Sequence, residues 1–163
     1  MPSQTPAVEV MTRDVVSFTA DTTVEEAVQA LGTRAISGAP VVDSDGRLIG
    51  LLEDSDLIVS QARIHAPSAI EILGAYIPLP SSLDRFREEV THAMASTVGE
   101  MMRVDPPAVG SDATLEDIAT LMTDHDVSRI PVVDADRRVV GIVSRGDLIL
   151  AMGRDSAGGF EAG

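Results

Sequence analysis

Three polar side chains that can bind a phosphorylated, hydroxylated ligand lie close together in the last quarter of the chain. Ser144, Arg145 and Asp147 follow a short apolar run and stand where a helix is expected to begin. The free N–H groups and the dipole of a helix N-terminus favour an anion. The Ser144 hydroxyl and the Arg145 fork suit phosphate oxygens, while the Asp147 carboxylate can accept both hydroxyls of a ribose diol. This pattern favours nucleotide binding.

The same spacing also forms an ordinary capping box, which gives a second interpretation. A Ser followed three residues later by an Asp stabilises the start of any helix. In that case Arg145 is a solvated surface charge and Asp147 serves the helix alone. One short motif does not separate ligand binding from capping, so both interpretations stay open.

The motif belongs to a unit that occurs twice. A shift of 91 positions aligns two segments without a gap, and the stretch APVVDSDGRLIG at 39–50 then matches IPVVDADRRVVG at 130–141. Pro40 falls on Pro131 and Asp56 falls on Asp147. An ordered match of this length indicates a duplicated unit rather than a chance similarity between two unrelated βα segments.

Each unit is predicted to be β-α-β-β-α, which places the chain in the α/β (α+β) class. A short extended piece at 15–18 precedes a helix with capping-box residues, Thr23 and Glu26 in the first unit. Two β-rich runs, 39–42 and 48–52, flank a polar turn, and a second helix starts near Asp54. One small sheet cannot bury both of its faces, so we expect two units packed sheet to sheet with pseudo-twofold symmetry.

The two units are predicted to span 8–58 and 98–152. Between them, residues 59–97 are expected to form a helical connection, with a short helix over 68–73, a loop over 77–82, and a second helix over 83–94. The tail from 153 to 163 is small and polar, which predicts disorder.

Composition excludes several classes of function. The chain has no cysteine, so it has no disulfide, no thiolate metal site and no cysteine nucleophile. A net charge of −14 argues against sequence-independent nucleic-acid binding and against an anionic membrane surface. No signal peptide and no membrane-spanning run is expected, which predicts a cytoplasmic protein. A P-loop, a GxSxG and an HExxH are all missing, so we do not expect an enzyme.

Taken together, the two units resemble a tandem CBS-domain pair, also called a Bateman module, of the kind seen in bacterial stand-alone CBS-pair proteins. The resemblance rests on the pairs Met11-Thr12 and Met102-Arg103, the capped helix, the Pro-Val-Val-Asp strand and the Gly-to-Asp-Leu passage into the last helix. It implies a regulatory module that dimerises and binds adenosine-containing ligands in two clefts between the units. AMP, ADP or ATP would then be the ligand, and no cofactor would be required.

The resemblance also assigns residues to the clefts. It places contacts with the adenine ring at the start of the second unit's first hairpin strand and at a proline below the ring. An aspartate that can bind the ribose is present in both units. The implied residues are Arg129, Ile130, Pro131 and Pro107 beside Asp147, with Asp56 and Ala39 at the matching positions of the first unit.

The first unit departs from this pattern. Glu53 and Asp54 stand where the second unit has Ser144 and Arg145. Three carboxylates at one helix start repel phosphate, so we expect one nucleotide per chain, bound at the second motif. A neutral nucleoside, S-adenosylmethionine, a bridging metal ion or nothing at all would suit the first cleft better.

Other functions stay open from the sequence. The chain can be a structural or protein-interaction module with empty clefts, or it can bind S-adenosylmethionine or NADH. A homodimer is expected because helix faces such as that of residues 24–31 are only partly covered within one chain. A regulated partner protein is expected as well, but no residue identifies it.

Overall fold

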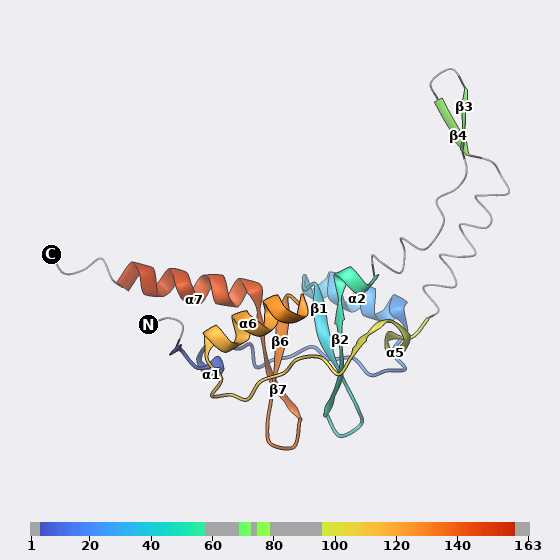
Figure 1. The fold of residues 1–163 in the computed structure, drawn as a ribbon. Coiled ribbons are helices and arrows are strands. Elements are labelled where there is room, and N and C mark those ends of the chain that lie inside the picture. Colours follow the sequence, from blue (N-terminus) through green and yellow to red (C-terminus); the bar gives the residue numbers. More distant parts are fainter. Residues whose placement is uncertain (1–3, 58–68, 73–74, 79–95, 159–163) are drawn as a thin grey trace.

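The computed structural model describes residues 4–57, 69–72, 75–78 and 96–158. The predicted α/β (α+β) class is confirmed, because helices and strands occur in the same order in both units (Figure 1). In the first unit they are α2 (Val24–Arg34), β1 (Gly38–Val42) and β2 (Leu48–Glu53), and residues 54–57 begin a further helix. In the second they are α6 (Leu115–His125), β6 (Arg129–Val133), β7 (Val139–Ser144) and α7 (Arg145–Gly158).

Both predicted capping boxes are present. In α2 the Thr23 side chain accepts a hydrogen bond from the Glu26 N–H at 3.2 Å, and the Glu26 carboxylate accepts one from the Thr23 N–H at 2.9 Å. Thr114 and Asp117 repeat the arrangement at 3.2 and 3.0 Å in α6. These bonds satisfy N–H groups that have no partner within the helix, so the start of each helix is encoded locally.

The two hairpins are also copies of one another. β1 pairs antiparallel with β2, and β6 pairs antiparallel with β7. The register is the same in both, with Ala39 opposite Leu52 and Ile130 opposite Val143, and each hairpin has an irregularity at the same point. The 91-residue shift therefore holds for the backbone pairing as well as for the residues.

The segments that lead into the two units are exchanged between them. The N–H of Ala7 in α1 (Ala7–Val10) donates to Ala113 at 2.8 Å, and Thr12 bridges to Ile142. Conversely, β5 (Arg103–Val104) pairs with β2 of the first unit. Each folded half therefore includes a segment that was predicted to belong to the other unit. For this reason neither predicted unit is complete alone.

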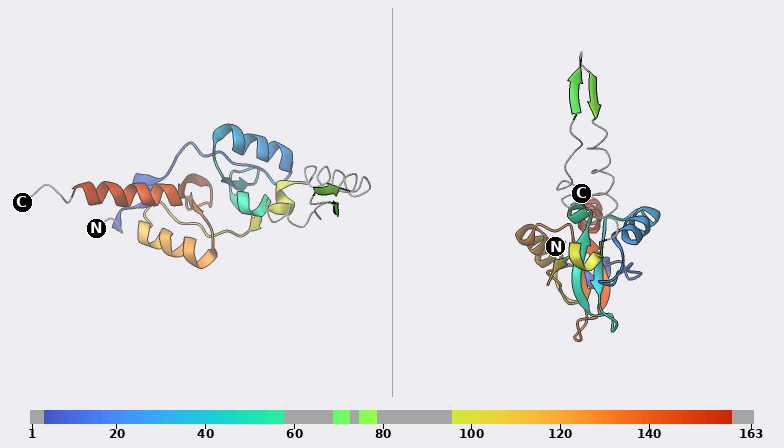
Figure 2. Two further views of the ribbon diagram at one scale, coloured as in Figure 1. Left: turned by 90° about the horizontal axis from the view of Figure 1, so that it is seen from above. Right: turned by 90° about the vertical axis from the view of Figure 1, so that its right-hand side faces the viewer.

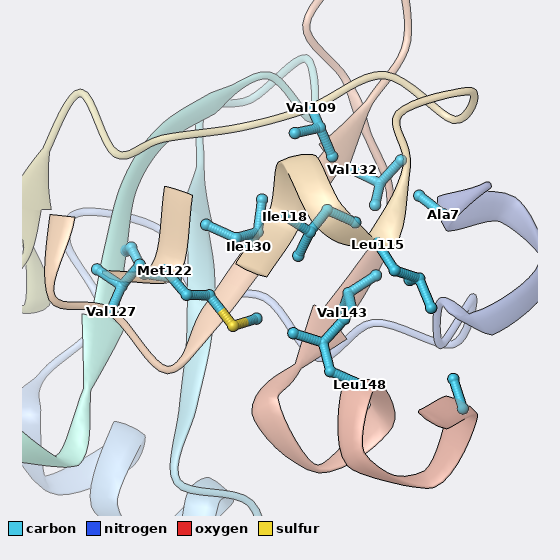
Figure 3. Close-up of a cluster of buried hydrophobic side chains, with 12 residues drawn as sticks. Ala7, Val109, Leu115, Ile118, Met122, Val127, Ile130, Val132, Val143 and Leu148 are labelled. Atoms are coloured by element: carbon cyan, nitrogen blue, oxygen red, sulfur yellow. The ribbon is translucent and has the colours of Figure 1, made fainter. Parts of the chain in front are cut away.

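The exchanged segments complete the two hydrophobic cores. Ala7 is fully buried in the core of the second unit. Figure 3 shows this core, which lies between α6 and the β6–β7 hairpin. Val98, at the start of α5 (Val98–Met101), is fully buried in the core of the first unit beside Phe18 and Ala27. In two views, α2 and α6 lie on opposite flanks of the hairpins, so the strands are covered from both sides (Figure 2).

The tips of the two hairpins meet in a symmetric contact. The Leu48 N–H donates to the Arg137 carbonyl at 2.9 Å, and the Val139 N–H donates to the Gly46 carbonyl at 3.2 Å. Arg47 and Arg138 form an isolated antiparallel bridge at the centre of this contact. The expected pseudo-twofold axis passes between these two arginines, which occupy equivalent positions in the two units.

Two expectations about the connection and the tail are wrong. Residues Ala69–Ile72 and Ala75–Pro78 form an antiparallel hairpin, β3 and β4, instead of a short helix and the start of a loop. Isoleucines and a tyrosine on either side of Gly74 explain this, because such residues favour strands. The expected disorder also fails for 153–158, which continue α7; a helix tolerates an interior glycine such as Gly153 at a cost of about 1 kcal/mol.

The remaining expectations for these regions lie outside the described residues. They include the helix over 83–94 and the last part of the tail, 159–163. In the described part of the chain, no helix is both long and apolar enough to cross a membrane.

The exchange of leading segments makes a prediction about Gly99. A Cβ at Gly99 in α5 would lie 2.9 Å from the Ala20 carbonyl oxygen of the first unit, which is backbone and cannot move aside easily. Gly99→Ala should therefore lower the free energy of unfolding by about 1–3 kcal/mol in urea titrations. Gly32→Ala, in the open surface of α2, is the matched control and should raise it by about 0.5–1 kcal/mol. Equal effects of the two changes would contradict the exchange.

Candidate functional site

A cavity of about 150 Å³ has walls from both units; we call it the Asp147 cavity. The second unit contributes Asp147 and Ser144 from the start of α7, together with Arg129 and Ile142. The first unit and its leading segment contribute the facing wall, which is made of Thr12, Asp14, Val15, Val16, Ile36 and Gly38. The site is thus polar on the α7 side and largely apolar on the facing side.

Asp147 is held by the capping hydrogen bonds that its spacing predicts. Its Oδ2 accepts from the Ser144 N–H at 2.7 Å and from the Ser144 hydroxyl at 2.9 Å, and its own N–H donates to Ser144 Oγ at 3.3 Å. A carboxylate has about four lone-pair sites. The capping interpretation is therefore correct as geometry, and it leaves acceptor capacity on a carboxylate that lines the cavity.

Several predicted site residues do not line this cavity. Ile130 and Pro131 are fully buried, and Ile130 lies in the core with Ile118 and Val143 (Figure 3). Ala39 is 1% exposed, and Pro107 and Asp56 are not among the lining residues. Their contacts with a ligand stay predictions. These five residues do not line the Asp147 cavity.

The pseudo-symmetry explains the difference. Val16 and Gly38 line the Asp147 cavity. Their equivalents in the second unit, 91 positions later in the sequence, are Pro107 and Arg129. The sequence placed the clefts between the units but took the contacts around Asp147 from the second unit alone, whereas the exchanged leading segments combine Asp147 with a wall from the first unit. The residues it missed, including Asp14, Val15 and Ile36, belong to no motif, so only the fold reveals them.

Arg145 is not among the residues that line the Asp147 cavity. It lines a separate hollow between α6 and α7, together with Met122, Asp126 and Leu148. Residues two apart on a helix are about 200° apart around its axis, so Arg145 and Asp147 lie on different faces. Arg145 therefore does not line the Asp147 cavity in this structure, and its predicted phosphate contact stays a prediction.

Arg129 instead supplies the cation on the cavity wall, and it is buried. The guanidinium donates from Nη1 to the Gly38 carbonyl at 3.0 Å and from Nη2 to Ser37 Oγ at 2.5 Å. Its Nε lies 3.4 Å from Oε1 of Glu53, which is 5% exposed. A Cβ at Gly38 would lie 2.8 Å from Arg129 Nε, so the absence of a side chain there makes room for the guanidinium.

Glu53 faces the other unit rather than a ligand. Besides Arg129, its Oε1 accepts from the Ser128 N–H at 2.9 Å and from the Ser128 hydroxyl at 2.6 Å. The sequence had grouped Glu53 with Asp54 and Asp56 as three carboxylates at one helix start. In the structure the Glu53 carboxylate is instead paired with Arg129 inside the interface between the units.

Asp56 lies beside this network. Its Oδ2 accepts from the Glu53 N–H at 2.9 Å. Burial raises the pKa of the Asp56 carboxyl, and the negative charges of Glu53 and Asp54 add to the rise, whereas the Glu53 N–H and the Arg103 guanidinium oppose it. The pairing of Arg103 in β5 with Leu51 in β2 brings the second unit's leading segment close to Asp56, as the first unit's lies near Asp147.

The described residues offer no metal site for the first cleft. Across 4–57, 69–72, 75–78 and 96–158, no three His, Asp or Glu side chains are grouped so that they could hold an ion.

Comparisons with known proteins agree with the duplicated architecture. A family model for the CBS domain matches residues 7–62 and again 98–154. The chain is 34% identical over 134 residues to the chloroplastic protein CBSX1 of Arabidopsis thaliana, covering 80% of this chain and 56% of that protein. It is 28% identical over 150 residues to protein MJ1426 of Methanocaldococcus jannaschii, covering 88% and 89%.

Solved structures share the fold. CBSX2 in complex with AMP superposes with a TM-score of 0.69 at 24% identity, covering 93% of this chain and 98% of that one. The CBS domain pair of protein MJ0100, in complex with 5′-methylthioadenosine and S-adenosyl-L-methionine, gives a TM-score of 0.67 at 21% identity with the same coverage. These likenesses concern the arrangement of elements and place it in one structural group with both proteins.

The raised pKa of Asp56 predicts an unusual pH dependence. Its stabilising contribution is present below the unfolded value of 3.8 and is lost as pH rises through the higher folded pKa. The unfolding free energy of Asp56→Asn, relative to the parent, should therefore increase between about pH 3.5 and 7 in urea titrations.

Asp117→Asn is the control, since hydrogen bonds from Thr114 lower the pKa of Asp117. Its unfolding free energy relative to the parent should fall over the same range. A flat or falling difference for Asp56→Asn would refute the assigned burial.

Proposed function

The chain belongs to the CBS domain family as a tandem pair, and from this premise we propose that it is a non-catalytic sensor that binds an adenosine-containing ligand in the Asp147 cavity. The observation that carries the proposal is the juxtaposition of the Asp147 carboxylate with an apolar wall from the other unit. A carboxylate suits a ribose diol because it accepts two hydroxyl hydrogen bonds at once. Val16, Ile36 and Ile142 suit the faces of an adenine ring.

The shared walls suggest how binding would be sensed. The cavity, at about 150 Å³, is smaller than the roughly 300–1,000 Å³ of most ligand pockets. We propose that an adenosine moves the walls of the cavity apart as it binds, and these walls belong to different units. A ligand shifts a conformational equilibrium only through differential affinity for the two states, and this site provides such a difference between closed and opened arrangements of the units.

The class of ligand is supported by relatives with the same fold. CBSX2 was solved with AMP, and MJ0100 was solved with 5′-methylthioadenosine and S-adenosyl-L-methionine. All three compounds contain an adenosyl group. We therefore propose adenosine derivatives, including AMP, ADP and ATP, as candidates, with no cofactor required and with a regulated protein as the downstream partner.

A second candidate function is an interaction module whose cavity stays empty. The observation that favours it is the complete capping box, in which Ser144 and Asp147 already satisfy one another. Under this alternative Asp147 contributes to the stability of α7 and nothing else.

One substitution separates the two functions. Asp147→Asn keeps the shape of the side chain but loses its charge, so under the binding proposal the affinity for adenosine should fall about 10- to 150-fold. Affinity is measured by calorimetry, after a thermal-shift screen of adenosine, AMP, ADP, ATP, NADH and S-adenosylmethionine, in which a ligand of the native state raises Tm. Asp117→Asn is the matched control, because Asp117 has the same capping role in α6 without lining the cavity.

If no compound raises Tm, or if Asp147→Asn binds as tightly as the parent, the interaction module is the better account.

We also propose a homodimer, as the family fold implies. Three large apolar side chains on α7, Ile149, Leu150 and Met152, are 60–64% exposed within one chain. Burying such a patch against its own copy is the commonest twofold solution. Light scattering should give twice the 17.1 kDa chain mass, and Leu150→Glu should shift the mass toward the monomer. A monomeric parent at tens of micromolar would refute the dimer.

A further inference from the structure

The Asp147 cavity has one cation among its described lining residues, and that cation is already paired. Arg129 contributes to the cavity wall, while its Nε lies 3.4 Å from the Glu53 carboxylate. The two side chains are 8% and 7% exposed. A desolvated pair of this kind holds its partners far more firmly than a surface pair does. The positive charge is therefore committed to Glu53 before any ligand arrives.

Glu53 occupies a place that is built for an anion. Its Oε1 receives the Ser128 N–H, the Ser128 hydroxyl and the Arg129 guanidinium. A backbone amide, a hydroxyl and a guanidinium are the groups with which proteins bind phosphate oxygens. The Glu53 carboxylate thus takes the position next to these donors in which a phosphate group would be stable.

The rest of the cavity wall is negative. Its other charged residues are the carboxylates Asp14 and Asp147. Arg145 lines a different hollow and does not balance them there. A phosphate in this cavity would face two carboxylates and would have to compete with Glu53 for Arg129. Displacing Glu53 would leave a buried carboxylate unpaired, which is strongly unfavourable.

We propose that Glu53 is a specificity-determining residue, which withholds Arg129 from the ligand so that the Asp147 cavity selects uncharged or positively charged adenosine derivatives over phosphorylated ones. The inference rests on the proposed function of this cavity and narrows its ligand class. It also gives a role to the difference between the units, because the position equivalent to Glu53 is Ser144, and the position equivalent to Arg129 is Gly38.

The test compares adenosine with AMP, which differ only in the phosphate. Calorimetry on the unmodified chain should show adenosine binding at least about tenfold more tightly than AMP, as expected when a phosphate meets uncompensated carboxylates. Glu53→Gln frees the charge of Arg129 from its anionic partner, while Gly38 and Ser37 still hold the guanidinium. The affinity for AMP should therefore rise about tenfold or more while that for adenosine changes little. S-adenosylmethionine should follow adenosine in the parent.

Two further variants make the result specific. Glu53→Gln combined with Arg129→Met removes the freed cation, so the gain for AMP should vanish. Asp54→Asn alters the net charge by the same amount as Glu53→Gln at an exposed neighbouring position, and it should bind both compounds as the parent does. The double variant leaves no buried charge unpaired, so it also serves if Glu53→Gln alone does not fold.

Three results would overturn the inference. A parent that binds AMP as tightly as adenosine refutes the charge selection but leaves the adenosine site intact. A gain for AMP in Asp54→Asn equal to that in Glu53→Gln refutes the role of Arg129. If the parent binds none of adenosine, AMP and S-adenosylmethionine, the proposed function and this inference are both refuted.

Discussion

Arg129 is buried between the two units, and a buried guanidinium is tolerated only when it is paired and hydrogen-bonded. Glu53 provides the charge from the other unit, and Ser37, Ser128 and the Gly38 carbonyl provide further partners. Each of these contacts except that with Ser128 joins the two halves of the duplication. Because the same guanidinium forms part of the Asp147 cavity wall, the pairing fixes both how the units sit together and which charge the cavity presents.

This network breaks a symmetry that the rest of the fold preserves. Capping boxes, hairpin registers, the bridge between Arg47 and Arg138, and the methionines beside Gly50 and Gly141 all repeat with the same shift. The pairs Glu53/Ser144 and Gly38/Arg129 do not. Duplication thus supplies two similar clefts, and two substitutions between equivalent positions are enough to give them different chemistry.

The sequence predicted what local patterns encode. The repeat, the helix starts at Thr23 and Thr114 and the two long hairpins follow from residue order and turn chemistry alone, and the structure has them. The segment that forms β3 was predicted as a short helix because a short apolar run with no clear period suits either element. That Arg145 and Asp147 lie on different sides of α7 follows from helical geometry, so their spacing in the sequence is enough to predict it.

The composition of the cavity cannot be predicted in that way. It depends on the exchange of the leading segments, which brings Asp14 and Val16 to Asp147, and no local motif encodes a contact across more than a hundred residues. The ion pair joins positions 76 apart and was hidden because Glu53 alone resembles any acidic residue at a helix start. Both features arise from packing between units, so they became visible only with the fold.

A double-mutant cycle on Glu53 and Arg129 tests the central claim most directly. Unfolding free energies of the parent, Glu53→Gln, Arg129→Met and the combined variant give the coupling between the two side chains. A buried interunit pair predicts a coupling above about 1 kcal/mol, with the double variant more stable than Glu53→Gln alone. Additive effects, within about 0.5 kcal/mol, would contradict the claim that this pair joins the units.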